Sequence, residues 1–445
     1  MKYTRRQFLQ QAAVASVAAG TLQVHPQEVF RKYRTALIGC GWWGKNILRE
    51  AIASKKVRIT ALCDVDRTQA QSAREMVHEQ TGDLPNLYED YRELLQRERP
   101  EIVIVATPDH WHPLITIHAV QAGAHVYVEK PISHTVIEGQ AMVRAARKYG
   151  RIVQVGLHRR VSPHNISGIQ FLRSGKVGKI GYVRAFVYST GVRGPEQPTP
   201  NEEPPKGLNW DLWCGPAPFR PFNRKIHPKG FRQFLDYANG TLGDWGVHWL
   251  DQILWWAGDV SPRRIYSTGG RPIKGLPINL PDAQTTDAPD SQVAVYEFES
   301  FTVEWEHRLY AGNPNEKGEN VGVYFYGTKG VFHMGWRTGW TFYPARKSQS
   351  VIHQPAQLHQ PNNQNIRELW ADFLDAIQND RLPVCDIEVG YRATLLCLLG
   401  MLSLKIGRSI EWDAEHERIV GDEYANLFLR REYRPGYQYP DPDLV

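Results

Sequence analysis

The chain of 445 residues lacks most of the features that would place a protein in a special class at once. Its five cysteines are an odd number without a Cys-x-x-Cys pair, so we expect neither a disulfide framework nor a zinc site, and no other metal is predicted. No block of lysine or arginine interrupts a mixture of 53 basic and 47 acidic residues, which argues against nucleic acid as a partner. No internal repeat is present, and beyond the N-terminal region no segment is expected to cross a membrane.

What the chain does contain is typical of a globular protein of two or three domains, because 42% of its residues are apolar and 22% are charged. Cys40 and Cys63 lie in apolar, strand-like segments and are expected to be buried free thiols. The 14 tryptophans and 20 tyrosines allow two interpretations, namely large aromatic core layers or sugar binding through the faces of the rings.

The N-terminal region resembles an export signal. Arg5 and Arg6 lie within Thr4–Gln10 (TRRQFLQ), which is similar to the twin-arginine consensus, and residues 11–22 are weakly apolar and too short to span a bilayer. We therefore expect residues 1–30 to be a twin-arginine signal peptide and linker of a bacterial protein that is periplasmic or otherwise exported. The alternative is an amphipathic helix that packs on the following domain.

Short apolar segments alternate with helical patterns over the first third of the chain. This alternation, with strands that are apolar throughout, predicts βαβ units and a parallel sheet covered on both faces. The sequence therefore predicts an α/β fold that begins with a Rossmann domain, a doubly wound parallel sheet, over residues 31–155. The expected strands are residues 35–39, 57–64, 101–107, 125–130 and 151–156, with helices ending near 54, starting near 68, and covering 113–122 and 135–149.

After residue 156 the pattern changes to longer segments in which apolar and polar residues alternate. This period of two indicates strands of a mostly antiparallel sheet with one solvated face. Residues 156–445 are thus predicted to form a second α/β domain with a large, open, mostly antiparallel sheet. The expected strands are residues 181–190, 291–300, 301–310 and 321–335, the last with a hairpin turn at GTKG, and the expected helices are 366–380 and 391–407, while the Pro-rich stretch 194–207 is expected to be a surface loop.

The motif GCGWWG, with Gly39, Gly41 and Gly44, follows the first expected strand and opens a helix. Glycines at these positions permit a tight turn and a close approach of the backbone to a pyrophosphate, which then faces the helix N-terminus. Asp64 ends the next strand, where a carboxylate can bind both ribose hydroxyls of NAD and would repel the extra phosphate of NADP. NAD is thus the expected cofactor, although Arg67 leaves some room for NADP. The alternative is a packing turn without a ligand.

Two further motifs contain candidate catalytic residues that are expected to lie near the cofactor. Lys130 in EKP follows a strand of the parallel sheet, and ligands of such sheets bind outside the carboxyl ends of the strands. Asp244 and His248 in GTLGDWGVHWLD are four residues apart, so on a helix they share one face and suit proton abstraction from an alcohol. Taken singly, these residues could be a surface lysine, a helix cap and a core histidine, or the Asp–His pair could bind a metal. ATPDHWH places His110 and His112 after another strand, in a loop that we expect to face the cofactor.

In combination, a GxGxxG with its acidic residue, EKP and DxxxH resemble the Gfo/Idh/MocA family of NAD(P)-dependent oxidoreductases. The resemblance covers residues 34–430 and is strongest to an exported, sugar-related branch found in bacteria that degrade complex glycans. The motifs that carry it are GCGWWG, CDVD, ATPDHWH, EKPISHTVIEG, QVGLHRR, NWDLWCGPAP, GDWGVHWLDQILWW and EVGYRATLLCLLGMLSLKIGRSIEWD.

The resemblance implies a sugar, polyol or glycoside as substrate, and an open sheet that forms the contact of a homo-oligomer, a dimer or tetramer. It implies that Lys130 contacts the reacting hydroxyl and that Asp244 and His248 complete the catalytic set, with His248 as general base. Together with the motifs, it gives as cofactor-binding residues Gly39, Gly41, Trp42, Trp43, Gly44, Asp64, Thr107, Pro108, His110, His112, Glu129, Lys130 and Gln154. It gives as substrate-binding residues Lys130, His158, Arg160, Trp210, Trp213, Asp244 and His248.

The expected function is transfer of hydride between a hydroxyl of a sugar or glycoside and a tightly bound NAD. A first alternative is a redox-neutral enzyme that oxidises the sugar transiently, cleaves the glycosidic bond by elimination or hydrolysis, and reduces the ketone again. The NAD-dependent α-N-acetylgalactosaminidases of the superfamily work in this way but usually lack a lysine at the position of Lys130. A second alternative, a non-catalytic sugar-binding protein, has no need for Lys130, Asp244 and His248 together.

Export through the twin-arginine route would constrain where the protein binds its cofactor. The twin-arginine route carries proteins that have already folded, so NAD must be bound in the cytoplasm and could not be replaced outside. We therefore expect slow cofactor release and a cycle that closes internally, through a second substrate or a redox-neutral reaction. The expected partners are the sugar substrate and the twin-arginine export machinery.

Overall fold

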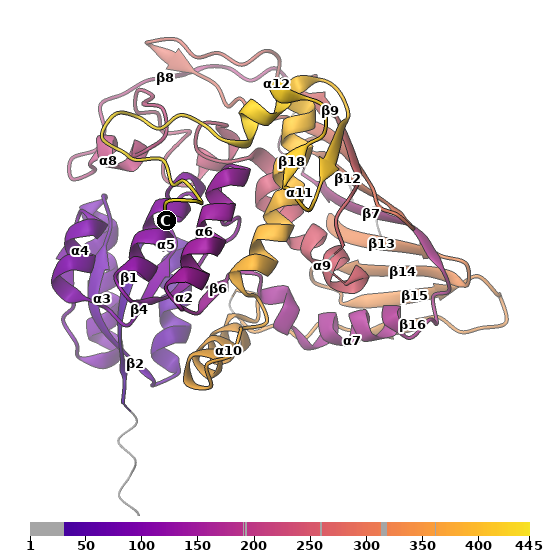
Figure 1. The fold of residues 1–445 in the computed structure, drawn as a ribbon, viewed down its shortest axis with the longest axis horizontal. Coiled ribbons are helices and arrows are strands. Elements are labelled where there is room, and N and C mark those ends of the chain that lie inside the picture. Colours follow the sequence, from indigo (N-terminus) through magenta and orange to yellow (C-terminus); the bar gives the residue numbers. More distant parts are fainter. Residues whose placement is uncertain (1–30, 190, 192–193, 259, 313–317, 361) are drawn as a thin grey trace, which may run out of the picture. The chain divides into compact units, whose positions relative to one another are not determined.

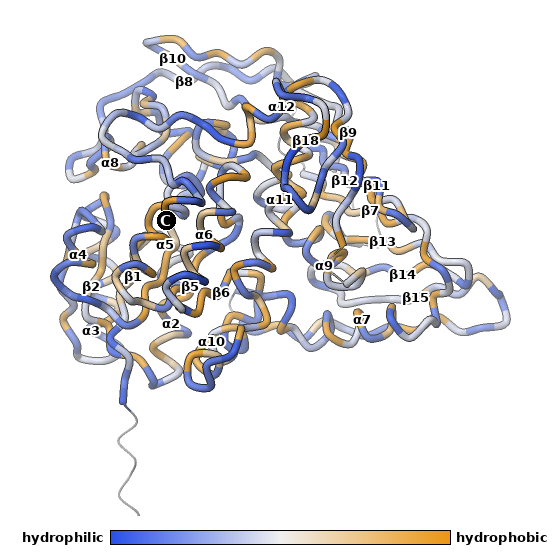
Figure 2. The backbone as a smooth tube through the Cα atoms, in the orientation of Figure 1, coloured by the Kyte–Doolittle hydropathy of each residue, from blue (hydrophilic) through white to orange (hydrophobic). Residues whose placement is uncertain are grey.

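The computed structural model describes residues 31–445 except residues 190, 192–193, 259, 313–317 and 361. The twin-arginine prediction falls on residues 1–30 and so lies outside the described residues. Figure 1 shows the ribbon, and Figure 2 shows the hydropathy of each residue along the same backbone.

Six parallel strands form the first sheet, in the order β3-β2-β1-β4-β5-β6. The side chains of β4 are all buried, as expected for a strand that is covered on both faces. The strand order reverses between β1 and β4, and the crevice at the carboxyl ends of these two strands is where such sheets bind ligands. The strands are β1 (Tyr33–Ile38), β2 (Val57–Cys63), β3 (Asn86–Tyr88), β4 (Ile102–Val105), β5 (His125–Val128) and β6 (Val153–Val155).

Five helices connect these strands. The helix α5 is buried almost all round because it packs on β4 and β5 and also contacts α4 and α6. The helices α3 and α4 are mainly hydrophilic (Figure 2). The doubly wound fold is confirmed, but the short β3 and the polar α4 were not predicted. The helices are α2 (Trp42–Ala53), α3 (Arg67–Thr81), α4 (Tyr91–Glu98), α5 (His112–Gln121) and α6 (Val136–Lys148).

Ten strands form the second sheet, in the order β16-β15-β14-β13-β7-β12-β11-β9-β17-β18. The predicted antiparallel arrangement is confirmed for all pairs but the central one, β7 with β12, which is parallel. The hairpin at GTKG joins β13 to β14 as expected. The strands are β7 (Ile180–Tyr188), β9 (Arg264–Gly270), β11 (Ser291–Glu297), β12 (Thr302–Arg308), β13 (Val321–Gly327), β14 (Gly330–Gly335), β15 (Trp340–Pro344), β16 (Ile352–Gln354), β17 (Ile410–Asp413) and β18 (Arg418–Ile419).

The helices that pack with this sheet are α7 (Pro163–Arg173), α9 (Val247–Ala257), α10 (Ile366–Gln378) and α11 (Ile387–Ile406). In Figure 1, α11 lies between α6 and the second sheet, and it contacts α6, α9 and β9. Within the described residues, α11 is the one helix long and apolar enough to cross a membrane by length and composition, but 72% of its most apolar window is buried inside the protein. We therefore interpret α11 as the core helix that joins the two sheets.

The Pro-rich stretch is more ordered than the expected surface loop. It forms β8 (Thr199–Pro200), which pairs with β10 (Ala283–Gln284), and its Glu196 carboxylate is bound by Lys225 and Arg271, both at 2.9 Å. The remaining short elements are α8 (Trp210–Cys214), α12 (Glu423–Asn426) and single helical turns at Asp109–Trp111, His158–Val161, Gly230–Gln233, Leu242–Gly246 and Leu427–Leu429.

Residues 33–445 form one compact unit in which the two sheets share a continuous hydrophobic core. All five cysteines are free and buried, as predicted for Cys40 and Cys63. The first sheet ends with β6 at Val155, and the division into domains at that point stays a prediction.

Candidate active site

A cavity of about 680 Å³ opens at the carboxyl ends of the first sheet and extends to the loops of the second part of the chain. The three glycines of GCGWWG have different structural roles next to this cavity. Gly39 has φ +94°, and a Cβ there would lie 2.6 Å from the carbonyl group of Ala106, so only glycine fits the turn. A Cβ on Gly44 would lie 2.0 Å from the Gly39 oxygen, which makes Gly44 a packing residue. Gly41 lines the cavity with nothing within 4 Å of its Cβ position, which leaves room for a pyrophosphate.

Asp64 stands at the cavity wall after β2. One carboxylate oxygen accepts the Cys40 N–H at 2.7 Å and the other accepts the Asp66 N–H at 2.8 Å, so Asp64 holds the glycine turn in place. Burial raises the pKa of Asp64 to about 6, although these two hydrogen bonds oppose the shift. A carboxylate has further lone pairs for ribose hydroxyls. Arg67 does not line the cavity, which supports NAD over NADP.

The start of α2 and the loop after β4 also line the part of the cavity that is expected to hold the cofactor. Trp42, Trp43, Thr107 and Pro108 line the cavity as expected, and Trp42 is 55% exposed with the Lys229 ammonium 5.3 Å from its ring centroid. This part of the site therefore combines a glycine turn, an acidic strand end and aromatic walls.

The three residues predicted to be catalytic line one cavity. Lys130 donates from Nζ to the Asp244 carboxylate at 2.7 Å and to the Asp244 carbonyl at 2.9 Å. Asp244 lies in a single π-helical turn that leads into α9, and His248 lies in the first turn of α9, so both face the same space. Arg232 donates from Nε to the same Asp244 oxygen at 3.2 Å. Burial alone would raise the pKa of Asp244, but Lys130 and Arg232 outweigh it and lower the pKa to about 2.

His248 is 6% exposed, and its Nδ1 is buried without a hydrogen-bond partner in the part of the chain that the structure describes. This leaves Nε2 as the nitrogen that can face the cavity. Burial, followed by the charges of Lys130 and Arg159, holds the pKa of His248 well below its usual value. The imidazole is therefore neutral near pH 7 and able to accept a proton.

Aromatic rings surround the reaction end of the cavity. The Trp336 ring lies 5.2 Å from that of His248, 5.6 Å from that of His158 and 5.3 Å from that of Trp245, and all four line the cavity. The guanidinium of Arg159 lies 3.5 Å from the Trp336 centroid, a cation–π contact that fixes the indole. Apolar ring faces of this kind suit the C–H faces of a sugar.

Four side chains of the expected site do not line the cavity. His110 is buried with Nε2 3.0 Å from the Trp213 carbonyl, and Gln154 donates to the Leu369 carbonyl at 2.8 Å in the core. Arg160 is ion-paired with Asp251 at 2.8 Å. Trp210 stacks behind Trp213, with ring centroids 4.5 Å apart, and only Trp213 reaches the cavity. These four side chains lie behind the cavity wall, where each is held by the partner named above.

Two other expected residues line the cavity but serve as supports. His112 lies between the Pro131 carbonyl at 2.8 Å and the Thr107 carbonyl at 2.9 Å, and so ties the loop after β4 to the loop after β5. Glu129 accepts the Lys130 N–H at 3.3 Å and is packed against Gly156, where a Cβ would lie 2.4 Å from its carboxylate.

The sequence analysis did not assign several residues that line the cavity, among them Asp109, Arg232, Trp245 and Trp336. Asp109 and Trp245 lie inside the quoted motifs ATPDHWH and GDWGVH, so their positions could have been found from the residues beside them. Arg232 and Trp336 come from loops without a local signal, and only the packing of the second part of the chain brings them to the site.

Residues 33–157 match the family described as "Oxidoreductase family, NAD-binding Rossmann fold", and residues 177–267 match the corresponding "C-terminal alpha/beta domain". The chain belongs to the Gfo/Idh/MocA oxidoreductase family. It is therefore an enzyme with an NAD-binding Rossmann fold at residues 33–157.

Relatives of known name and structure agree with this assignment. A D-glucoside 3-dehydrogenase of Escherichia coli (strain K12) is 24% identical over 388 residues, which are 85% of this chain and 97% of that protein. A glycosyl hydrolase family 109 protein of Stenotrophomonas maltophilia (strain K279a) is 30% identical over 230 residues, which are 47% of this chain and 49% of its own length. The structure of levoglucosan dehydrogenase in complex with NADH and levoglucosan has a TM-score of 0.66 at 18% identity, covering 86% of this chain and 99% of that one.

Proposed function

We propose that this member of the family oxidises a ring hydroxyl of a sugar or glycoside with an NAD that it keeps bound. The observation that carries the proposal is the single cavity that joins Gly41 and Asp64 at one end to Lys130, Asp244 and His248 at the other. The similarity to a D-glucoside 3-dehydrogenase over most of both chains supports a glycoside as substrate.

Lys130, Asp244 and His248, at the reaction end of the cavity, have different roles in the proposed reaction. His248, neutral and with Nε2 available, accepts the proton of the ring hydroxyl, while Lys130 donates a hydrogen bond to the oxygen as negative charge develops on it. One such preorganised donor contributes about 3 kcal/mol of transition-state stabilisation. Asp244 holds the Lys130 ammonium at 2.7 Å and so fixes its direction. Bound NAD supplies the acceptor for the hydride.

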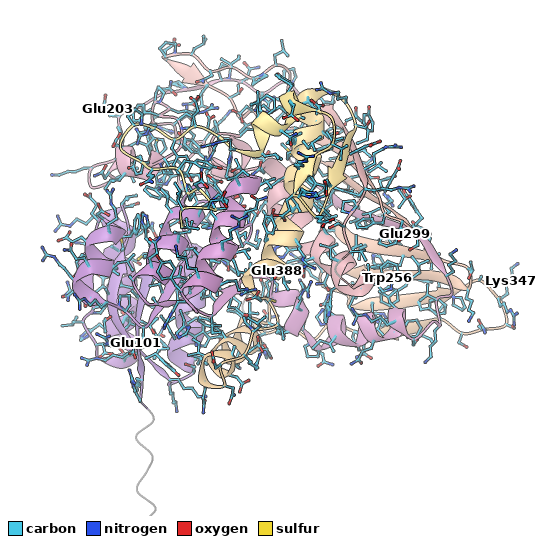
Figure 3. The ribbon with its side chains drawn as sticks, in the orientation of Figure 1. Glu101, Glu203, Trp256, Glu299, Lys347 and Glu388 are labelled. Atoms are coloured by element: carbon cyan, nitrogen blue, oxygen red, sulfur yellow. The ribbon has the colours of Figure 1, made fainter. Side chains whose placement is uncertain are left out.

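Replacing the lysine tests this assignment. We expect Lys130→Met to retain NAD and to lose at least about 100-fold in the rate of cofactor reduction by a panel of glycosides, because the developing alkoxide loses its cationic donor. Rates of cofactor reduction, followed by absorbance, measure this loss. Lys347→Met is the matched control, since Lys347 lies on the exposed loop between β15 and β16 (Figure 3). Normal turnover by the Lys130 variant would show that the site is assigned wrongly.

Retention of the cofactor is supported by segments that cover the nucleotide end of the cavity. Leu212 and Trp213 line the cavity, and residues 207–213, called the cover below, are held to the loop after β2 by two backbone hydrogen bonds. The Arg67 N–H donates to the Gly207 carbonyl at 2.9 Å, and the Asn209 N–H donates to the Val65 carbonyl at 2.9 Å. The cover thus closes over the loop that carries the ribose-binding carboxylate.

Arg434 and Tyr437, in the C-terminal tail, contact this cover and residues beside it. Arg434 donates from Nε to the Gly215 carbonyl at 2.8 Å and from Nη1 to the Asp211 carboxylate at 2.8 Å. The Tyr437 ring contacts that of Trp111, with centroids 5.6 Å apart. We expect these contacts to slow the release of the cofactor.

We further propose that residues 1–30 direct the folded, NAD-loaded enzyme out of the cell through the twin-arginine route, and that the enzyme is a homo-oligomer. The supports are the TRRQFLQ sequence and the family resemblance. Loss of export in an Arg5→Lys, Arg6→Lys variant, followed by cell fractionation, tests the route. Light scattering of the mature protein tests for a dimer or tetramer.

A redox-neutral reaction is the second candidate. It is favoured by the similarity of 230 residues to a glycosyl hydrolase family 109 protein and by the need of an exported enzyme to restore its own NAD. Cleavage of a glycoside without lasting cofactor reduction distinguishes this reaction from a net dehydrogenation.

A further inference from the structure

The reaction end of the cavity contains a carboxyl group that the oxidation step does not use. Asp109 follows β4 at the same sheet edge as Lys130, lines the cavity and is only 5% exposed. Its neighbours His110 and His112 are both engaged by backbone carbonyls, whereas no other described side chain forms a hydrogen bond with the Asp109 carboxyl. A buried acid without such a partner inside a ligand cavity calls for a functional explanation.

The charges that face Asp109 come from three other elements. Arg232 lies in the turn Gly230–Gln233, Lys130 follows β5, and Asp244 lies in the π-helical turn before α9. Burial raises the pKa of Asp109 to about 7, the two cations oppose that shift and Asp244 adds to it. Asp109 is therefore a stronger base than Asp244 and still partly ionised at neutral pH.

The other titratable groups of the reaction end are already committed or weaker. His248 takes the hydroxyl proton, Lys130 is held by Asp244, and Glu129 is packed against Gly156 and accepts the Lys130 N–H. His158 has a pKa well below its usual value because of burial and the charge of Arg159. Asp109 is the group that remains for a second proton transfer.

We propose that Asp109 is a second catalytic residue, the base that removes the proton from the carbon next to the oxidised one. This inference rests on the proposed function, because the proton becomes acidic only after NAD has taken hydride from the sugar. The C–H bond breaks, an O–H bond forms on Asp109, and the electron pair moves into an enolate whose oxygen is stabilised by Lys130. From that enolate a leaving group on the next carbon can depart with its bonding electrons, or the proton can return.

Exchange of hydrogen in D₂O separates this step from oxidation. The protein as purified with its NAD is mixed with methyl glycosides, and both cofactor reduction and deuterium in the recovered sugar are measured. In the wild type we expect reduction together with deuterium at the carbon next to the reacting one, at a rate that rises with pH through about 7 as Asp109 ionises. Asp109→Asn is expected to slow exchange by at least about 100-fold while hydride transfer slows by less than about tenfold.

Asp282→Asn, an exposed acid on another loop, is the matched control, and Asp109→Glu is expected to restore part of the exchange. Cofactor content and thermal unfolding show that the variants are folded. Exchange by Asp109→Asn at the wild-type rate, a wild type that reduces NAD without exchange, or equal loss of both steps would overturn the inference alone. A wild type that never reduces its NAD would overturn the proposed function, and this inference with it.

Discussion

At the scale of residues, the site contains groups whose protonation is set by burial and by a few charges. Asp244 is held ionised by Lys130 and Arg232, His248 is held neutral, and Asp64 is shifted towards protonation. The residue types were predictable, because Gly39, Gly41, Lys130 and the Asp–His pair lie in motifs with fixed spacing. The residues that interact with them were not predictable. Arg232, for example, donates to Asp244 from a loop that lies close to Asp244 only in the folded chain.

The shifted pKa of Asp64 makes NAD binding depend on pH. We propose that the carboxylate accepts hydrogen bonds from the ribose. Because its pKa is raised to about 6, it becomes protonated as pH falls through that value. The affinity for NAD should then decrease about tenfold between pH 7 and pH 5, in line with the loss of one charge-assisted hydrogen bond.

Titration of cofactor-free protein with NAD by calorimetry measures this effect. The Asp64→Asn variant should bind weakly at both pH values. Asp83→Asn should follow the wild type, because Asp83 is a half-buried acid that pairs with Arg58 and does not line the cavity. An affinity that stays constant over this range would contradict the assigned role of Asp64.

At the scale of elements, the sequence predicted what local pattern alone determines. The apolar strands β1, β2, β4 and β5 were found because each is continuous and bounded by turns. The three-residue β3 and the polar α4 were missed, since a short strand carries too few residues to show a period. Trp213 was predicted to reach the site, but the backbone hydrogen bonds that hold its segment to distant loops were not predicted, because they leave no periodicity in the sequence.

The tail contact of Arg434 gives a prediction for cofactor release. Arg434→Ala removes three hydrogen bonds, one to the Gly215 carbonyl beside the cover and two to Asp211 within it, so NADH should dissociate at least about tenfold faster. Stopped-flow fluorescence of NADH displacement measures the rate.

Arg408→Ala provides the comparison, because Arg408 also binds an aspartate, Asp422 at 2.7 Å, but at the other end of the C-terminal region. This control should release NADH at the wild-type rate. If the Arg434 variant did the same, the tail would have no part in retaining the cofactor.

At the scale of the whole molecule, the Rossmann sheet supplies the nucleotide end of the cavity, and the region of the π-helical turn, α9 and Trp336 supplies the reaction end. The core helix α11 joins the two sheets, so the distance between the two ends is set by a packed interior rather than by a hinge. We propose that the enzyme leaves the cell with its NAD in place, because residues 1–30 resemble a signal for folded export and Leu212 and Trp213 line the cavity.

The central claim is that hydride moves from a sugar carbon to the NAD that the protein carries. The most direct measurement mixes the mature protein, as purified and without added NAD, with a glucoside deuterated at its ring carbons, and determines the mass of the extracted cofactor. We predict one deuterium on the reduced nicotinamide in the wild type, and labelling that is at least about 100-fold slower in Lys130→Met. Cofactor that is absent, or that stays oxidised and unlabelled while the glucoside binds and is not cleaved, would contradict the account.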